Sequence, residues 1–276
     1  MKYAGFDVSF FCWRGFHSTG NMSYNGGGTG AISAMLTAIY YHCKYFGISS
    51  PIFAFDSRKN YRKKILPGYK DRPPANEKEM EDRKEIFKQI RDLRTFILPT
   101  LGFKNIFQQT GLEADDILAR LVRDNPGEFI VLTGDEDLLQ LVDDCTWFSP
   151  VKKVLINEST FRKKYGIAPR DWRLVKQIAG CTSDKVKGIH MVGEKTVLKY
   201  LNGTLNKNNW IYPVILEEKE AVMQRNAILV NLPFPKTKSM EIQKDEFSRE
   251  GFEAICDIFG LNRLAQKADE WETLFK

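Results

Sequence analysis

The sequence predicts an α/β protein with a mostly parallel central sheet, helices on both faces of that sheet, and a helical C-terminal region. Over residues 1–150, short apolar runs typical of buried strands alternate with segments whose apolar residues recur at helical spacing. Such alternation favours a parallel sheet covered by helices. After Pro150 the pattern becomes almost wholly helical, without a low-complexity linker. We therefore expect two regions, residues 1–150 and 151–276, joined in one compact body without a flexible hinge.

The first region is expected to open with a strand over residues 3–8 that ends near Asp7. The glycine-rich residues 25–30 lack the GK[ST] ending of a P-loop, so a turn is expected there rather than a nucleotide site. Thr29 is expected to cap the helix that follows. The later elements of this region are a helix over 31–46, a strand over 51–55, a helix over 77–101, a strand over 104–108, a helix that begins within 111–123, a strand over 128–133, a short helix over 137–142 and a strand over 145–148. In the second region, an edge strand is expected at 154–156, with helices at 161–165, 170–179, 194–201, 210–229 and 252–259.

The composition is that of an ordinary globular chain. Its 276 residues are 43% hydrophobic and carry a formal net charge of +6, which excludes a disordered tail, a collagen-like fibre and a coiled-coil rod. The sequence has neither the roughly 18 apolar residues of a membrane helix nor the apolar run of a signal peptide. Five scattered cysteines without a CxxC pair, and only three histidines, argue against a disulfide framework or a zinc centre. We expect a cytoplasmic protein with reduced thiols and no membrane partner.

Charge is strongly segregated along the chain. Residues 57–72 carry seven Lys or Arg and one Asp, and residues 151–200 carry twelve Lys or Arg and four acids. Between them, residues 113–144 carry ten acids and two Arg. A basic run alone is usually a solvated helix face. Two basic segments on either side of a dense carboxylate segment instead indicate a polyanion held near a divalent-metal site.

Seven carboxylates share one expected position in the fold, at or just after the end of a strand. The carboxyl ends of the strands in an open parallel sheet lie along one edge, so these side chains would converge there. Carboxylates this close repel one another, and a bound divalent cation relieves the repulsion. Oxygen ligands suit Mg²⁺ or Mn²⁺, and a pair of such ions can promote phosphodiester cleavage by water. Any single aspartate at a strand end could instead form a turn or cap a helix. The seven are Asp7, Asp56, Glu113, Asp115, Asp116, Asp135 and Asp137.

Residues 188–196 (GIHMVGEKT) are expected to form a tight hairpin that leads into a helix. Backbone N–H groups at and after Gly193 would face a phosphate oxygen, assisted by the helix dipole. Lys195 and Lys199 lie one helical turn apart and add positive charge. Such a turn is a weak signal alone, but downstream of a carboxylate cluster it favours a grip that positions a duplex without reading its sequence.

Taken together, these residues resemble the 5′ nuclease family, which includes flap endonucleases, bacteriophage 5′-3′ exonucleases and the N-terminal 5′ nuclease domain of bacterial DNA polymerase I. The matching stretches occur in the family's order over roughly residues 3–200, and the EADD, TGDxD and GxKT elements together are highly specific. The resemblance implies a PIN-like core, an arch within residues 57–95 and a helix–three-turn–helix near residues 184–200. The stretches are GFDVSFFCWRGFH, TGAISAMLTAI, FAFDS, LPGYKDRPP, TGLEADDILARLV, LTGDEDLLQLV, FRKKYGIAP, IAGCTSDKVKGI and MVGEKT.

The resemblance also implies roles for individual residues. The seven carboxylates, together with Asp184, match the family's metal ligands. Lys70 matches a basic residue that approaches the scissile phosphate, and Arg72 would assist it, so both are expected to be catalytic. A potassium ion at the hairpin is a further expectation. The residues expected to contact DNA are Arg58, Lys59, Arg62, Tyr69 and Lys70 at the arch, and Gly188, Gly193, Lys195, Thr196 and Lys199 at the hairpin.

The chain departs from the family pattern at residues 180–185 (GCTSDK). The family has Gly-Asp-x-x-Asp-Asn there, and both aspartates serve the second metal. Here Cys181 replaces the first aspartate and Lys185 replaces the asparagine. Because a neutral thiol is a poor Mg²⁺ ligand, we expect a weakened second site that prefers Mn²⁺. Two alternatives stay open: Asp184 suffices through water ligands, or this member has relaxed activity. Met191 also stands where the hairpin often carries glycine.

The sequence therefore predicts a metal-dependent 5′ nuclease, a monomer that cuts DNA at 5′ ends, flaps or nicks during replication and repair in a bacterial or phage-infected cytoplasm. RNA of an RNA–DNA hybrid is a second candidate substrate, and both exonuclease and endonuclease preference stay open. One rival is a structure-specific DNA-binding protein that has lost catalysis, motivated by Cys181. The other is a PIN-like ribonuclease, which the GxKT hairpin and the basic arch disfavour.

Overall fold

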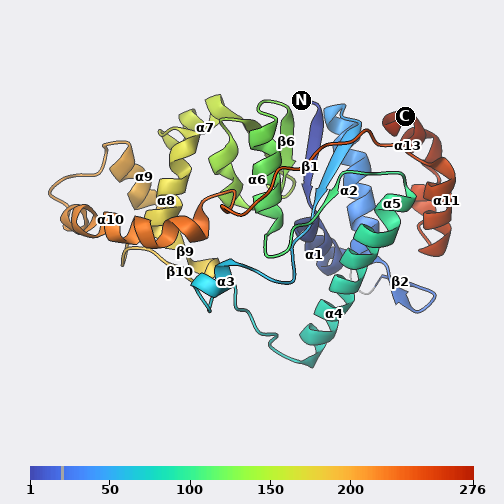
Figure 1. Cartoon of the computed structure of the whole chain (residues 1–276), viewed down its shortest axis with the longest axis horizontal. Helices are drawn as coiled ribbons and strands as arrows, with labels where there is room; N and C mark the ends of the chain where they lie inside the picture. Colours follow the sequence, from blue (N-terminus) through green and yellow to red (C-terminus); the bar gives the residue numbers. More distant parts are fainter. Residues whose placement is uncertain (20–21) are drawn as a thin grey trace.

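A computed structural model of the chain describes residues 1–19 and 22–276. Six strands form the central sheet in the order β5-β4-β1-β6-β7-β8 (Figure 1). Neighbouring strands are parallel except β7 and β8, so β8 is an antiparallel edge strand, as expected. The central strands β4, β1 and β6 bury nearly all of their side chains, which a sheet covered on both faces requires. The predicted fold class is confirmed. The strands are β1 (Tyr3–Asp7), β4 (Ser50–Ala54), β5 (Ile106–Phe107), β6 (Phe129–Leu132), β7 (Cys145–Ser149) and β8 (Val154–Ile156).

One face of the sheet packs against the first two helices and the last three. Apolar side chains of these helices form a single core with strand residues such as Phe6 and Phe53. Trp271 is fully buried in this core, and its ring stacks 6.1 Å from that of Tyr40. Residues 247–275 therefore belong to the core of the first half, whereas the sequence grouped them with the helical DNA-binding region 151–276. The helices are α1 (Val8–Thr19), α2 (Gly30–Phe46), α11 (Arg249–Ile258), α12 (Asn262–Ala265) and α13 (Ala268–Phe275).

The opposite face of the sheet packs against α6 (Ala114–Asp124), and the apolar core on this side continues into α8 (Trp172–Ala179) and α10 (Ile211–Val230), which pack against each other. Phe129 of β6 shares this core with Ile117 of α6 and Val175 of α8. The core thus joins residues from both sides of position 150. The smaller elements on this side are η2 (Glu136–Leu141), α7 (Glu158–Tyr165), η3 (Pro169–Asp171), β9 (Gly180–Cys181), η4 (Thr182–Asp184), β10 (Val186–Lys187) and α9 (Glu194–Leu201).

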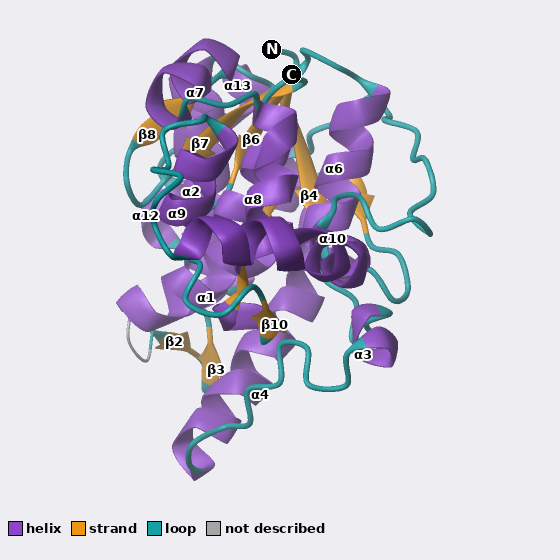
Figure 2. Cartoon of the chain, turned by 90° about the vertical axis from the view of Figure 1, so that its left-hand side faces the viewer, coloured by secondary structure: helices purple, strands orange, loops and turns teal. Residues whose placement is uncertain are grey.

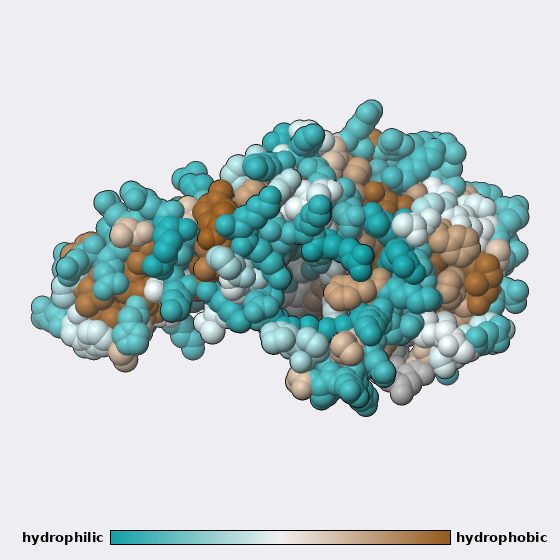
Figure 3. All heavy atoms as spheres, turned by 60° about the horizontal axis from the view of Figure 1, so that its bottom comes forward, coloured by the Kyte–Doolittle hydropathy of each residue, from teal (hydrophilic) through white to brown (hydrophobic). Residues whose placement is uncertain are grey.

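Beyond the carboxyl ends of the central strands lie α3 (Arg62–Ile65) and α4 (Glu77–Asp92), joined by a loop that passes below the sheet (Figures 1 and 2). A π-helical turn, η1 (Leu93–Ile97), and α5 (Leu98–Thr100) extend α4 and complete the helix expected over 77–101. The small hairpin of β2 (Ser23–Tyr24) and β3 (Gly27–Gly28) lies beside α4. Seen toward this end, the surface is hollowed, and mostly hydrophilic residues surround the hollow (Figure 3).

The first strand ends at Asp7, as expected, and Val8 already begins α1, with buried residues at the helical spacing of 8, 11, 12 and 15. One local prediction is wrong. Thr29 precedes α2 without capping it, because its hydroxyl makes no bond to the helix. The side-chain oxygen of Gln89 from α4 accepts from the first backbone N–H groups of α2 instead, at 2.9 and 3.3 Å. Across the part of the chain that the structure describes, no helix is long and apolar enough to span a membrane.

Candidate active site

Five carboxylates converge where the central strands end. Asp7 is the last residue of β1, the middle strand, while Asp56 and Asp135 follow its neighbours β4 and β6. Glu113 immediately precedes α6, and Asp115 lies in its first turn. The topology brings these groups together because β4, β1 and β6 are adjacent and parallel.

The pKa values of several of these carboxylates are raised, in part by the negative charges of their neighbours. Burial, followed by the charge of Asp56, raises the pKa of Asp7 to about 7. Burial, followed by the charge of Asp137, raises the pKa of Asp135 to about 6. The pKa of Asp115 is raised well above its ordinary value by burial and then by Asp135 and Asp7. The ionised cluster is therefore unfavourable without added positive charge.

Local hydrogen bonds fix the orientation of the carboxylates. Asp7 accepts from the backbone N–H of Phe10 and from the Thr133 hydroxyl, both at 3.1 Å. Asp56 accepts from the backbone N–H of Ala114 at 2.9 Å, and Asp135 accepts from that of Asp137 at 2.8 Å. Held this way, the side chains present oxygen atoms only, which is the donor set of Mg²⁺ or Mn²⁺. The residues present thus fit a hard divalent cation.

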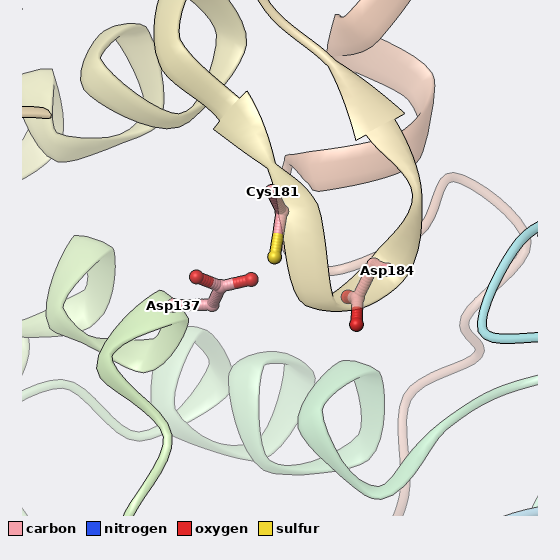
Figure 4. Close-up of side chains that lie close together, drawn as sticks. All are labelled: Asp137, Cys181 and Asp184. Atoms are coloured by element: carbon pink, nitrogen blue, oxygen red, sulfur yellow. The ribbon is translucent and has the colours of Figure 1, made fainter. Parts of the chain in front are cut away.

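A second group of ligand atoms lies beside the first. Asp137 belongs to η2, whereas Cys181 and Asp184 belong to the β9–η4 segment. Each of the three side chains offers one ligand atom, and these atoms lie within 4.8 Å of one another (Figure 4). The thiol of Cys181 lies 3.0 Å from the Ser183 hydroxyl, which also donates to Asp184 at 3.2 Å. This is the position at which the sequence departs from the family pattern.

The segment after α3 brings basic groups to both sets of carboxylates. The Lys70 ammonium donates to Glu113 at 2.6 Å and lies 3.8 Å from Asp184. Arg72 donates to the backbone carbonyl of Ser183 at 2.6 Å, and its guanidinium lies 3.7 Å from Asp184. Burial, the largest single influence, would lower the pKa of Lys70, but the charges of Glu113, Asp115 and Asp184 together outweigh it, so the pKa is well above its ordinary value. Both basic side chains therefore lie against the carboxylates of the site.

Tyr69 does not lie on an exposed DNA-binding surface. The side chain is buried, and its hydroxyl donates to Glu113 at 3.0 Å. The sequence predicted that Tyr69 contacts DNA, but its aromatic ring packs inside the protein. Its position instead orients a predicted metal ligand.

The structure does not support two further predictions, the metal-ligand role of Asp116 and the DNA-binding role of Arg62, for one shared reason. The two side chains form a bidentate ion pair, at 2.6 and 2.7 Å, and both are almost completely buried. Asp116 also accepts from the backbone N–H groups of Glu113 and Phe234. Arg62 also donates to the backbone carbonyl of Leu229 at 2.8 Å. The pair therefore ties α3 to α6 and to the end of α10, away from metal and DNA.

The other predicted DNA-binding residues lie on the surface. Arg58 and Lys59 are exposed beside α3, and Lys195 and Lys199 are exposed on α9. Gly193 precedes α9, and no atom lies within 4 Å of where its side chain would be, so the helix start is open to a ligand. Thr196 lies in the first turn of α9.

Gly188 has a packing role instead. A Cβ at this position would lie 2.2 Å from the backbone of Ala179, so only glycine lets the hairpin close against α8. Thr182, Lys185, Lys187, His190 and Met191 line a cleft of about 890 Å³ next to this hairpin. A DNA contact by Gly188 stays a prediction.

Lys176 lies beside the second ligand group, and the sequence did not indicate it. It is buried in α8, and its ammonium lies 2.8 Å from Asp137 and 2.6 Å from Glu194, the first residue of α9. It thereby connects the second ligand group to the predicted duplex grip. The sequence gives little indication of these ion pairs, because a lysine within an amphipathic helix is ordinarily exposed.

An open parallel α/β sheet, with carboxylates gathered at its strand ends and basic side chains facing them, defines a class: the divalent-metal enzymes that hydrolyse phosphate esters. Residues 4–166 match the model of the 5′-3′ exonuclease N-terminal, resolvase-like domain. The chain belongs to the 5′-3′ exonuclease family, which confirms the predicted resemblance.

Individual relatives agree with this assignment. The chain is similar to a 5′-3′ exonuclease of Buchnera aphidicola, with 29% identity over 91% of this chain and 87% of the relative. It is also similar to DNA polymerase I of Mycobacterium tuberculosis, with 37% identity over 54% of this chain but only 16% of that polymerase. Among solved structures, the bacteriophage T5 D15 flap endonuclease, in a complex with DNA and metal ions, superposes with a TM-score of 0.66. It shares 18% identity over 98% of this chain and 99% of that one. At 18% identity, this match supports the fold assignment alone.

Proposed function

We propose that this chain is a metal-dependent 5′ nuclease that hydrolyses phosphodiester bonds of DNA at 5′ ends, 5′ flaps or nicks. The observation that carries the proposal is the convergence of Asp7, Asp56, Glu113, Asp115 and Asp135 at the strand ends, directly opposite Lys70. The family assignment and the DNA complex of the T5 D15 relative support the same substrate class. The protein is a hydrolase that acts on DNA and uses divalent metal.

The chain's own residues have distinct tasks in this reaction. The five carboxylates would hold the metal, which supplies activation of a water and neutralisation of phosphate charge. Lys70 and Arg72 face the same position and stabilise the negative charge that develops on the phosphate. Lys176 holds Asp137 in place through its ion pair. The site would bind Mg²⁺ or Mn²⁺, two ions when fully loaded, with a second ion bound more weakly because of Cys181.

DNA would be held on both sides of the carboxylates. The start of α9, with Lys195, Thr196 and Lys199, would bind the duplex backbone, and a potassium ion could join the hairpin to a phosphate. Exposed Arg58 and Lys59 would meet the 5′ single strand near α3. Phe87 of α4 is 57% exposed and would offer a stacking surface, and Trp13 of α1 supports it through an edge-to-face contact at 5.8 Å.

Cleavage of 5′-labelled substrates tests the proposal. A 5′ flap, a nicked duplex and an RNA–DNA hybrid are incubated with Mg²⁺ or Mn²⁺, and the length of the first product distinguishes endonuclease from exonuclease action. We expect metal-dependent cleavage of the flap and the nick, and a loss of at least about 100-fold in Lys70→Ala. Flap binding without cleavage in either metal would instead favour the catalytically weakened DNA-binding protein.

A further inference from the structure

We propose that Asp137, Cys181 and Asp184 form a mixed thiolate–carboxylate site that selects a borderline-soft divalent cation, of the Zn²⁺ class, over Mg²⁺. This inference rests on the proposed function, since it specifies the second metal of the same active site. It replaces the idea of a merely weakened site with one of altered selectivity.

The geometry of the three side chains suits a small four-coordinate ion. Cys181 projects from the end of β9 and Asp184 from η4, and Asp137 faces them from η2 (Figure 4). Their ligand atoms lie within 4.8 Å of one another. A tetrahedral ion with ligand distances of about 2.1 Å to oxygen and about 2.3 Å to sulfur needs them roughly 3.6 Å apart. A contraction of about 1 Å therefore suffices, within the range of side-chain rotation.

The ligand atoms of this group differ from those of the first site. Asp7, Asp56, Glu113, Asp115 and Asp135 offer oxygen only, which suits a hard ion. The second group includes a sulfur, and thiolate ligands favour Zn²⁺ and related ions, whereas Mg²⁺ requires near-octahedral oxygen. Three protein ligands also leave one position open for a phosphate oxygen, as in other catalytic zinc sites.

Positive side chains surround the second group. Lys176 lies 2.8 Å from Asp137, and Lys70 and Arg72 lie 3.8 and 3.7 Å from Asp184. These three cations offset the two carboxylates and weaken the charge attraction for any divalent ion. The metal–sulfur bond is then the interaction that distinguishes Zn²⁺ from Mg²⁺. When it forms, the Cys181 thiol releases its proton to solvent and the thiolate takes the ion.

Cys181 is also accessible from solvent. It is the partly exposed member of the five cysteines, and Cys12, Cys43, Cys145 and Cys256 are buried. The Cys181 thiol donates to the Ser183 hydroxyl at 3.0 Å, and that hydroxyl donates to Asp184, so a hydrogen-bond chain links the two ligand side chains. A thiol probe of metal binding therefore reports on this site.

Spectroscopic titration with Co²⁺ tests the inference without relying on catalysis. The full chain is titrated with Co²⁺, and the near-ultraviolet sulfur-to-cobalt charge-transfer band is recorded for wild type, Cys181→Ser, Cys181→Asp and the control Cys145→Ser. We expect a band that saturates at one ion per chain in wild type and Cys145→Ser and is absent from both Cys181 variants. Zn²⁺ should displace Co²⁺ at equimolar concentration, whereas a large excess of Mg²⁺ should not. Zn²⁺ affinity should fall at least about tenfold in Cys181→Ser.

The outcomes separate this inference from the proposed function. A missing band in wild type, a band that survives Cys181→Ser, or equal displacement by Mg²⁺ would overturn the mixed site. Cleavage of a 5′ flap by the same samples, measured separately with Mg²⁺, Mn²⁺, Zn²⁺ and Co²⁺, tests the nuclease. A cobalt band without cleavage in any metal would leave the site intact and refute the nuclease. Cleavage without the band would support the nuclease and refute the mixed thiolate–carboxylate site.

Discussion

Replacing Arg62 by alanine should destabilise the whole protein rather than weaken DNA binding alone. The side chain is 1% exposed and makes a bidentate ion pair with Asp116, whose side chain is fully buried. Alanine would leave the Asp116 charge buried without a partner and would leave the Leu229 carbonyl without its donor. Breaking a buried pair by removing one partner costs about 3–5 kcal/mol of unfolding free energy. A change of this size should lower the thermal unfolding midpoint by roughly 6–20 °C.

Urea and thermal unfolding, followed by circular dichroism, measure this effect. Lys63→Ala is the matched control, because Lys63 is the next residue along and is exposed. That control should change the unfolding free energy by no more than about 0.5 kcal/mol. A double variant, Arg62→Met with Asp116→Leu, should lose less than the sum of the two single variants, since no unpaired charge remains. Equal stability of Arg62→Ala and Lys63→Ala, with weakened flap binding in Arg62→Ala alone, would refute the structural role and restore the DNA-binding one.

Three further predictions concern the cluster and the hairpin. Because the pKa values of Asp7 and Asp135 are raised to about 7 and about 6 in the fold, the metal-free protein should lose stability as pH rises from about 4 to about 7. In saturating Mg²⁺, thermal unfolding should show no such loss of stability. A stabilisation by Mg²⁺ that is equal at about pH 5 and about pH 7.5 would contradict this prediction. In duplex-binding titrations, Lys195→Ala with Lys199→Ala should reduce the slope of log affinity against log salt by about 2, and an unchanged slope would exclude both phosphate contacts. Met191→Gly should stabilise the protein by about 1 kcal/mol, since Met191 has a left-handed φ of 61° while 68% exposed; Met191→Ala should give no such gain.

Much of the site could be predicted because parallel topology fixes where strand ends lie. Asp7, Asp56 and Asp135 follow buried strands, so their convergence needed only the sheet order. The error at Asp116 has a geometric cause. Successive residues on a helix differ by about 100° in direction, so Asp115 and Asp116 cannot both face the same edge. Asp115 faces the cluster, and Asp116 faces the core.

Other features depend on contacts that no local pattern contains. Arg62 lies within a basic run that is typical of an exposed surface, and its burial depends on Asp116 and on the end of α10, far along the chain. Lys176 is similar, since its partners are Asp137 and Glu194. The placement of residues 247–275 against α2 follows from the shape of the apolar core, in which Trp271 meets Tyr40.

The rate of 5′-flap cleavage by Asp135→Asn, compared with wild type at saturating Mg²⁺ and Mn²⁺, tests the central claim most directly. Asparagine keeps the side-chain oxygen that accepts from the Asp137 backbone N–H, so η2 should keep its start while the cluster loses one negative charge. With a normal unfolding midpoint and normal flap binding, cleavage should fall at least about 100-fold in both metals. Cleavage at the wild-type rate, or wild-type cleavage that persists in EDTA, would contradict a metal-dependent nuclease built on these carboxylates.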